Sequence, residues 1–524
     1  MVELTLLLGL LLATVVLAPI AERFNVPYPV ALLGFGLVLA FTPGLKVPEV
    51  NPDLILPLVL PPLLFAAARR TSWRQFLDNR RAIGLLAVAL VGVTAFAVGA
   101  LLSALIPGLP LAAGLALGAA VAPPDPVAAT AVARKLRLPQ RLRTVLEGEG
   151  LSNDATALVL YEVAVAATVT GAFSPWHAGG TLVLAITVGV AIGLLIAVIT
   201  RWLVGRLPPH PAASALILVV PFAAYAAADA AHGSGVIAVV TVALALSRAG
   251  DVESSQTRFV TGTTWEIVEL LVTGAAFAFV GLELRAVAGS VGGPVGELVW
   301  QALLVTVAVV VIRFLWIIPV ASLDERMRRR KNDTAEPTGW REMTVASWAG
   351  MRGVVTLVAV LALPIGPEPF PERDRLIFIA FVVIVVTLLV QGLTLPLLVH
   401  ALNVRAPEGD EEDLEQHLMH RAREASSRCL REIEDRPDAD GDVVGQVREN
   451  ADRMWHSMGL RPRDGSADRD AEHVEHAGTV NAMKDELLAA AREAVLEARA
   501  EPGTDPTVVD RVLRRLDAKG SQPE

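Results

Sequence analysis

Thirteen hydrophobic blocks, each long enough to cross a lipid bilayer, constrain this chain more than any other feature. They lie near residues 3–21, 28–43, 53–68, 82–106, 110–133, 144–171, 179–204, 211–231, 233–249, 259–284, 289–321, 342–366 and 373–402. A spanning helix needs about 20 mostly apolar residues, and 53% of the 524 residues are hydrophobic. The sequence therefore predicts an all-α polytopic membrane protein with about 13 transmembrane helices. Residues 53–68, with three prolines, or 211–249, split at Gly233–Gly235, could instead form a re-entrant pair.

The basic residues of the loops predict how the chain lies in the membrane. If the loop after the first block is cytoplasmic, 21 lysines and arginines fall in cytoplasmic loops and four in external loops. This asymmetry is typical of membrane proteins, and one missed span would erase it. The first block has an acidic start, Met1-Val2-Glu3, unlike a signal peptide. We expect a multi-pass plasma-membrane protein with its N-terminus outside and its C-terminus in the cytoplasm.

The composition changes abruptly after Val404, where the hydrophobic blocks end. The remaining residues are rich in Asp, Glu, Arg, Ala and Leu, with apolar residues at helical spacing near 483–500. We therefore divide the chain into a transmembrane domain, 1–404, and a helical cytoplasmic C-terminal region, 405–524. Cys429 is the single cysteine, which excludes an internal disulfide and a thiolate-based metal site.

One hydrophobic block carries buried acidic candidates for an ion site. The run 145–169 contains Glu149, Asn153 and Asp154, although a charge at the bilayer centre costs about 2.5–3.5 kcal/mol on insertion scales. On a helix, Asn153 and Asp154 lie about 100° apart at neighbouring heights, and Glu149 lies one turn away on the face of Asn153. Their oxygens suit a hard cation. No basic residue lies within two turns of Asp154, so we favour an ion site over a packing role.

Two helix breaks are predicted near the middle of the membrane. Asp125 lies in the run APPDPV, residues 122–127, where three prolines prevent a regular helix. Arg352 lies between Gly350 and Gly353 near the centre of its block, and an arginine there can satisfy the exposed carbonyl ends of an interrupted helix. Broken helices in corresponding places of two halves are typical of inverted-repeat secondary transporters, with the ion site near the midplane.

Four motifs resemble those of the monovalent cation:proton antiporter family, of the bacterial sodium/proton exchanger type. They are LEGEGLSNDATALVLY (146–161), APPDPVAAT (122–130), WAGMRGVVTLVAVLALP (348–364) and VTLLVQGLTLPLLVHAL (386–402). The resemblance covers residues 1–404. It implies thirteen spans with inverted repeats and two crossing broken helices, arranged as a dimerisation domain and a mobile core domain, usually in a homodimer.

The resemblance also implies roles for individual residues. Asp154 would bind the cation and the proton in turn, assisted by Asn153 and Asp125. Glu149 would form a buried ion pair with Arg313, although Arg313 lies about eight residues from a helix end and could also extend to the surface. Arg352 would occupy the second broken helix. No cofactor and no nucleic-acid partner is expected.

Three departures from the family pattern leave the cation open. Pro124, Gly150 and Thr273 stand where many relatives have threonine, serine and asparagine, respectively. Two side-chain oxygens are thereby lost, so the choice among Na⁺, Li⁺ and K⁺ is undecided, with Na⁺ favoured.

The predicted activity is the exchange of a monovalent cation for H⁺ by alternating access, for pH and sodium homeostasis. Burial disfavours a charged carboxylate, so a proton and a cation become competing occupants of Asp154. With Asn rather than a second Asp at 153, one proton per cation and no net charge movement are expected. The alternatives are a K⁺/H⁺ antiporter with the same site, and a transport-inactive membrane sensor that signals through residues 405–524. A membrane enzyme is disfavoured, because no hydrolase, protease or nucleotide-binding motif is found.

Overall fold

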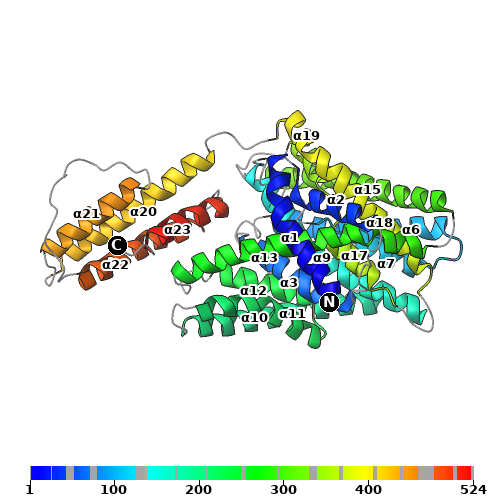
Figure 1. The fold of residues 1–524 in the computed structure, drawn as a ribbon, viewed down its shortest axis with the longest axis horizontal. Helices are drawn as coiled ribbons and strands as arrows, with labels where there is room; N and C mark the ends of the chain where they lie inside the picture. The colour runs from blue at the N-terminus through cyan, green and yellow to red at the C-terminus, as the bar shows by residue number, and fades with distance from the viewer. Residues whose placement is uncertain are drawn as a thin grey trace. The chain divides into compact units, whose positions relative to one another are not determined.

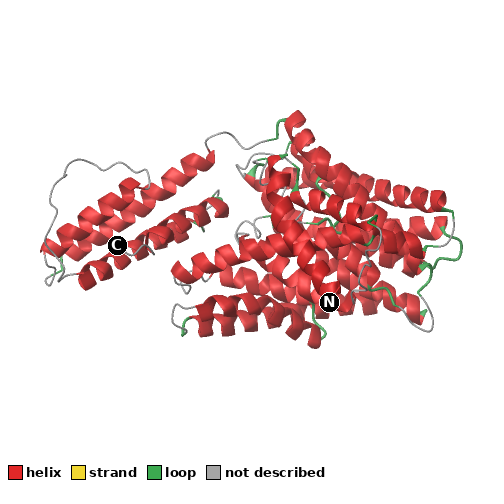
Figure 2. Ribbon diagram, viewed as in Figure 1, coloured by secondary structure: helices red, strands yellow, loops and turns green. Residues whose placement is uncertain are grey.

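The described residues of the computed structural model are mostly helical (Figures 1 and 2). The structure describes residues 2–24, 26–42, 52–70, 79–125, 136, 138–171, 175–206, 211–248, 255–291, 294–329, 339–364, 370–404, 410–436, 441–457, 477–499 and 504–520. No strand occurs within these ranges, which confirms the predicted all-helical class.

The helices before residue 404 follow the hydrophobic blocks. They are α1 (Val2–Arg23), α2 (Tyr28–Ala40), α3 (Pro52–Arg70), α5 (Arg80–Gly84), η1 (Leu85–Leu90), α6 (Val91–Leu105), α7 (Leu111–Val121), α9 (Gln140–Thr170), α10 (Pro175–Val204), α11 (Pro211–Ala230), α12 (Gly235–Arg248), α13 (Ser255–Leu282), α14 (Leu284–Ser290), α15 (Val295–Arg329), α16 (Trp340–Trp348), α17 (Val354–Leu361), α18 (Arg373–Val386), η2 (Thr387–Gln391) and α19 (Gly392–Leu402). The elements η1 and η2 are π-helical turns inside longer helices.

Seven helices in the described part of the chain are long and apolar enough to cross a bilayer. Four further apolar helices are shorter: 28–40, 57–69, 111–121 and 235–247. Other predicted spans fall outside these groups for physical reasons. Helix α9 carries the charged residues of the candidate site, and the block 342–366 is divided between α16 and α17.

Two segments that were open to a re-entrant arrangement form helices. Residues 52–70 are one helix, α3, which continues through Pro57, Pro61 and Pro62. Neighbouring protein can re-satisfy the backbone groups that proline frees inside a membrane. Residues 211–248 form two helices, α11 and α12, and His232 between them has a positive φ of 57°.

Contacts divide the chain into two compact units, one of residues 1–200, 217–246 and 264–406, and the other of residues 201–216, 247–263 and 407–524. The first contains a continuous apolar core to which α6, α7, α9, α15, α17 and α18 contribute. Helices α6 and α7 approach closely because glycines face each other: a Cβ added to Gly114 would lie 2.6 Å from the carbonyl oxygen of Gly99. The candidate site lies within this packed core.

The second unit contains four amphipathic helices: α20 (Asp410–Glu434), α21 (Gly441–Ser457), α22 (Ala477–Ala498) and α23 (Pro506–Gly520). Their apolar faces form a small core that includes Leu418, Trp455, Val495 and Val512. Glu415, which is largely buried, pairs with both Arg511 and Arg515 of α23. This part of the chain thus has an apolar core and ion pairs of its own.

Candidate functional site

The candidate site is built from α9 and the ends of two interrupted helices. Helix α9 carries Glu149, Asn153 and Asp154, whose exposed fractions are 1%, 0% and 2%. Helix α7 ends at Val121 and is followed by non-helical residues up to Asp125, beyond which 126–135 lie outside the described residues. The second interruption separates α16 from α17 and contains Arg352 and Gly353.

The two interruptions contact each other directly. The backbone N–H of Asp125 donates to the carbonyl oxygen of Met351 at 2.6 Å. Gly353 leaves room for the Asp125 side chain, because a Cβ added there would overlap the Asp125 carboxylate. Asp125 therefore packs on the backbone at the N-terminus of α17, where the positive end of the helix dipole favours a negative charge.

Arg352 satisfies the end of the other interrupted helix as well as its own break. Its Nε donates to the carbonyl oxygen of Val121 at 2.9 Å, and Nη2 donates to that of Ala122 at 3.3 Å. Nη1 donates to the carbonyl oxygen of Gly350. A cation at the C-terminal end of α7 complements the helix dipole. The backbone N–H of Arg352 donates to Oγ1 of Thr387 on η2, at 3.1 Å.

Glu149 and Arg313 form a buried, bidentate ion pair between α9 and α15. Nη1 and Nη2 of Arg313 lie 2.5 and 2.9 Å from the two carboxylate oxygens. Arg313 also donates from Nε and Nη2 to the carbonyl oxygen of Ala346, at 3.3 and 3.1 Å. Only 2% of its side chain is exposed, so the alternative that Arg313 extends to the surface is wrong: a carboxylate inside the bundle offers a closer partner.

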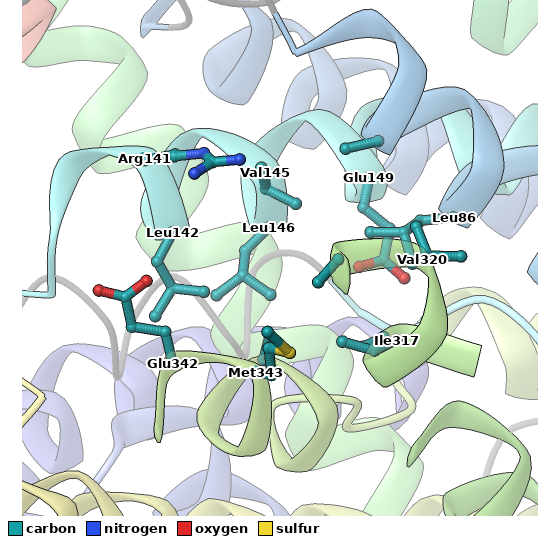
Figure 3. Close-up of a pocket in the computed structure, with 13 residues that line it drawn as sticks. Leu86, Arg141, Leu142, Val145, Leu146, Glu149, Ile317, Val320, Glu342 and Met343 are labelled. Atoms are coloured by element: carbon teal, nitrogen blue, oxygen red, sulfur yellow. The ribbon is translucent and has the colours of Figure 1, made fainter. Parts of the chain in front are cut away.

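A cavity of about 60 Å³ opens beside this ion pair (Figure 3). Of its thirteen lining residues, ten are apolar and come from α5, η1, α9, α15 and α16. In Figure 3, Glu149 lies near Leu86 and Val320, whereas Arg141 and Glu342 lie at the other end of the lining. Neither Asn153 nor Asp154 belongs to the lining. This cavity therefore reaches the ion pair and not the candidate ion site.

Asn153 connects α9 to the first interruption and keeps an oxygen free. Its Nδ2 donates to the carbonyl oxygen of Pro124 at 3.2 Å. Its Oδ1 is buried and has no hydrogen-bond partner in the described part of the chain. A buried oxygen without a donor is available to a cation.

Asp154 differs from the other buried charges at the site. Neither a hydrogen bond nor an ion pair engages its carboxylate within the described ranges. The charge that interacts with it is negative, the carboxylate of Asp125. Two neighbouring carboxylates in a buried site favour an added positive charge. The oxygens of Asp154, Asn153 and Asp125 are those that could hold a cation here.

The sequence did not predict the roles of Thr387 and Gly353. Thr387 accepts a hydrogen bond from the backbone of Arg352, and Gly353 leaves space for the side chain of Asp125. A signal for Thr387 was present, since it is one of few polar residues in the apolar run 376–399. The sequence predicts Gly353 as a helix breaker, but its contact with Asp125 joins residues more than 200 positions apart.

Comparisons with known proteins place most of the chain in one family. The family model described as sodium/hydrogen exchanger, transmembrane, matches residues 10–401. An uncharacterized Na⁺/H⁺ exchanger of Mycobacterium tuberculosis is 33% identical over 525 residues, which cover 98% of this chain and 94% of that protein. A sodium, potassium, lithium and rubidium/H⁺ antiporter of Bacillus pumilus is 31% identical over 471 residues, 86% of this chain and 69% of that protein.

The fold also resembles a solved structure, that of the sodium proton antiporter MjNhaP1 from Methanocaldococcus jannaschii. The TM-score is 0.59 at 18% identity, and the match covers 77% of this chain and 99% of that chain. At this identity the similarity concerns the fold alone. The family match, the close relatives and the apolar helices lead to one conclusion: this chain is a multi-pass membrane protein that belongs to the sodium/hydrogen exchanger family.

Proposed function

We propose that the protein exchanges a monovalent cation, Na⁺ in the first place, for H⁺ at Asp154. The observation that carries this proposal is a buried carboxylate without a hydrogen-bond donor or cation among the described residues, next to a free amide oxygen. A buried charge without compensation is costly, so Asp154 needs a proton or a cation. Because one carboxylate cannot hold both, each occupant displaces the other.

The residues around Asp154 have supporting roles in this proposal. Asn153 provides a neutral oxygen ligand, and Asp125 adds negative charge at the first interruption. Arg352 satisfies carbonyl oxygens at the two interrupted helices. Glu149 and Arg313 neutralise each other's charge inside the protein. The core moves between inward- and outward-open states only when Asp154 is occupied, which couples the two gradients.

The proposal extends to topology and assembly. Residues 1–404 form the exchanger, with thirteen spans, inverted repeats and crossing broken helices, and residues 405–524 form a cytoplasmic helical region. The N-terminus lies outside the plasma membrane, and two copies form a homodimer. The loop charges support this orientation. The cation is substrate rather than a resident metal, and Li⁺ and K⁺ are further candidates, as the Bacillus pumilus relative's name includes both ions. The cellular role is pH and sodium homeostasis.

The experiment is cation-driven proton efflux from proteoliposomes that contain a pH-sensitive dye, with Na⁺, Li⁺ and K⁺ compared. Asp154→Asn should abolish efflux, because an amide cannot exchange a proton for a cation. Glu162→Gln is the matched control, since Glu162 lies on the same helix with an exposed side chain and should keep activity. Exchange retained by Asp154→Asn would remove Asp154 from the central role.

Stoichiometry is tested in the same vesicles. One proton per cation moves no net charge, so a diffusion potential set with thiocyanate should leave the rate unchanged. A membrane potential is worth about 2.3 kcal/mol per charge per 100 mV, so an electrogenic cycle would respond strongly. A clear voltage dependence would contradict the electroneutral mechanism and leave the exchange itself standing.

A further inference from the structure

The continuous helix formed by α18, η2 and α19 carries three polar side chains, Thr387, Gln391 and Thr394, near the second interruption. Oγ1 of Thr387 accepts the backbone N–H of Arg352 at 3.1 Å, and Oγ1 of Thr394 accepts Nε1–H of Trp348 at 2.9 Å. Gln391 lies four residues after the first threonine and three before the second, which places all three on one helix face. Gln391 therefore faces the unwound residues 349–353.

The neighbouring glycine supports this placement. A Cβ added to Gly392 would lie 3.4 Å from Sδ of Met351, which belongs to the interruption. The residue directly after Gln391 is thus close to Met351 of the unwound segment.

The amide of Gln391 is buried and unpaired in the part of the chain that the structure describes. The side chain is 2% exposed, and neither Oε1 nor Nε2 has a hydrogen-bond partner among the residues that the structure describes. Leaving such groups unsatisfied is unfavourable, and buried polar groups are normally paired with protein or with ordered water. Gln391 also ends the π-helical turn η2, and π-helical turns are frequent at functional sites.

The unwound segment offers complementary groups. The N–H groups of Gly350 and Met351 and the carbonyl oxygen of Ala349 have no hydrogen bond within the described ranges. The carbonyl oxygens of Gly350 and Met351 are already occupied, by Arg352 and by Asp125. Ala349 and Met351 are 1% and 0% exposed. Both facing sides therefore bury donors and acceptors that have no partner among the described residues.

We propose that ordered water bridges Gln391 to the backbone of residues 349–351, which makes Gln391 a positioning residue for the second interruption. The mixture of donors and acceptors suits water, which makes about three hydrogen bonds when buried. A cation is disfavoured by two N–H donors and by the adjacent Arg352 guanidinium. An anion would leave the carbonyl of Ala349 and Oε1 of Gln391 unpaired.

This inference deepens the proposed function and rests on it for its consequence in transport. Residues 349–351 lie directly before Arg352, and the carbonyl oxygen of Met351 accepts the backbone N–H of Asp125. Gln391 makes no hydrogen bond with Asp154, Asn153 or Asp125 among the described residues, so it acts on the site through this segment. Loss of the bridge should therefore lower the maximal exchange rate about tenfold and change the KM for Na⁺ less than twofold.

The water itself is detected by X-ray hydroxyl-radical footprinting of the full chain in detergent. Radicals generated from bound water oxidise adjacent buried side chains, and Met351 is a reactive reporter at the segment. The matched variants are Gln391→Asn and Gln391→Leu, because asparagine and leucine have the same shape and differ in polarity. Oxidation of Met351, normalised to intrinsic reactivity, should exceed that of buried Phe381 at least fivefold in wild type and Gln391→Asn. It should fall at least fivefold in Gln391→Leu.

Each outcome bears on one of the two ideas. Wild-type Met351 that is oxidised no faster than Phe381 overturns the water site, even if a variant fails to fold. Equal oxidation in the Asn and Leu variants also overturns it, because packing alone would affect both alike. Vesicle exchange is the second readout: a wild type that shows no exchange but has polarity-dependent Met351 oxidation contradicts the proposed function and leaves the water site standing.

Discussion

Replacement of Gly353 by alanine should separate the two helix interruptions. The new methyl group would overlap the carboxylate of Asp125 and lie 2.7 Å from its Cβ. The backbone at Gly353 is extended, with φ −134° and ψ −154°, so alanine fits the conformation and the effect is steric alone. Asp125 cannot retreat freely, because its N–H is held by the carbonyl oxygen of Met351 at 2.6 Å.

The magnitude follows from the overlap. Forcing an extra carbon into a packed core costs about 1–3 kcal/mol. At roughly 2 °C per kcal/mol for a large chain, the melting temperature in detergent should fall by about 2–6 °C. Displacing Asp125 from Asp154 should lower Na⁺-driven proton efflux about tenfold. Gly92→Ala in α6 is the control, since nothing lies within 4 Å of its added Cβ, and it should keep both stability and exchange.

A double variant tests the proposed cause. Asp125→Gly removes every overlapping atom, so adding Gly353→Ala to it should cost no further stability. Exchange should stay low in the double variant, because the carboxylate is gone. The steric reasoning would be refuted if Gly353→Ala kept wild-type melting temperature and efflux, or if its stability loss were as large without the Asp125 side chain.

Three further perturbations test other parts of the structure. Arg313→Leu should destabilise the protein by about 3–5 kcal/mol, because Glu149 is left buried without a partner; adding Glu149→Leu should recover most of that loss in thermal unfolding, and no recovery would contradict the pairing. Arg352→Lys keeps the charge but cannot reach three carbonyls at once, so it should lower both melting temperature and exchange, and an unchanged variant would show that these hydrogen bonds are dispensable. Burial and the nearby Glu486 raise the pKa of the Cys429 thiol, so at pH 7 the folded protein should react with iodoacetamide more slowly than the denatured protein. The reaction rate should rise with pH as the thiolate forms, and Glu486→Gln should increase it. Equal rates in the folded and denatured protein would contradict the effect of burial.

Local backbone chemistry made the interruptions predictable from the sequence. Gly350 and Gly353 mark the place where α16 ends and α17 begins, and the prolines after Ala122 mark the end of α7. The all-helical class followed from the hydrophobic blocks in the same way. These features depend on residues within a few positions of each other, where steric and hydrogen-bonding rules act directly.

Contacts between distant segments were not predictable from local pattern. The pairing of Glu149 with Arg313 spans 164 positions and was expected only from the family resemblance. The packing of Asp125 on Gly353 had no local signal. The flanking glycines predicted that Arg352 would satisfy carbonyl groups at its own interruption, but not that it would reach those of Val121 and Ala122. The exact number of spans stays a prediction, because charge in α9 and the division of 342–366 obscure the hydropathy signal that defines a span.

The distribution of compensating groups explains why Asp154 is the group best suited to exchange its partner. Arg352 is held by three carbonyl oxygens, and Glu149 is held by Arg313 through two hydrogen bonds. A charged side chain with a fixed partner cannot bind and release a transported ion, because separating it from that partner inside the protein is costly. Asp154, by contrast, has no such partner in the described residues and faces a second carboxylate. A bound cation or proton is then the least costly way to compensate the buried charge of Asp154. Because Asp154 is buried without a protein partner among the described residues, we expect it to bind each of these ions in turn as the core moves.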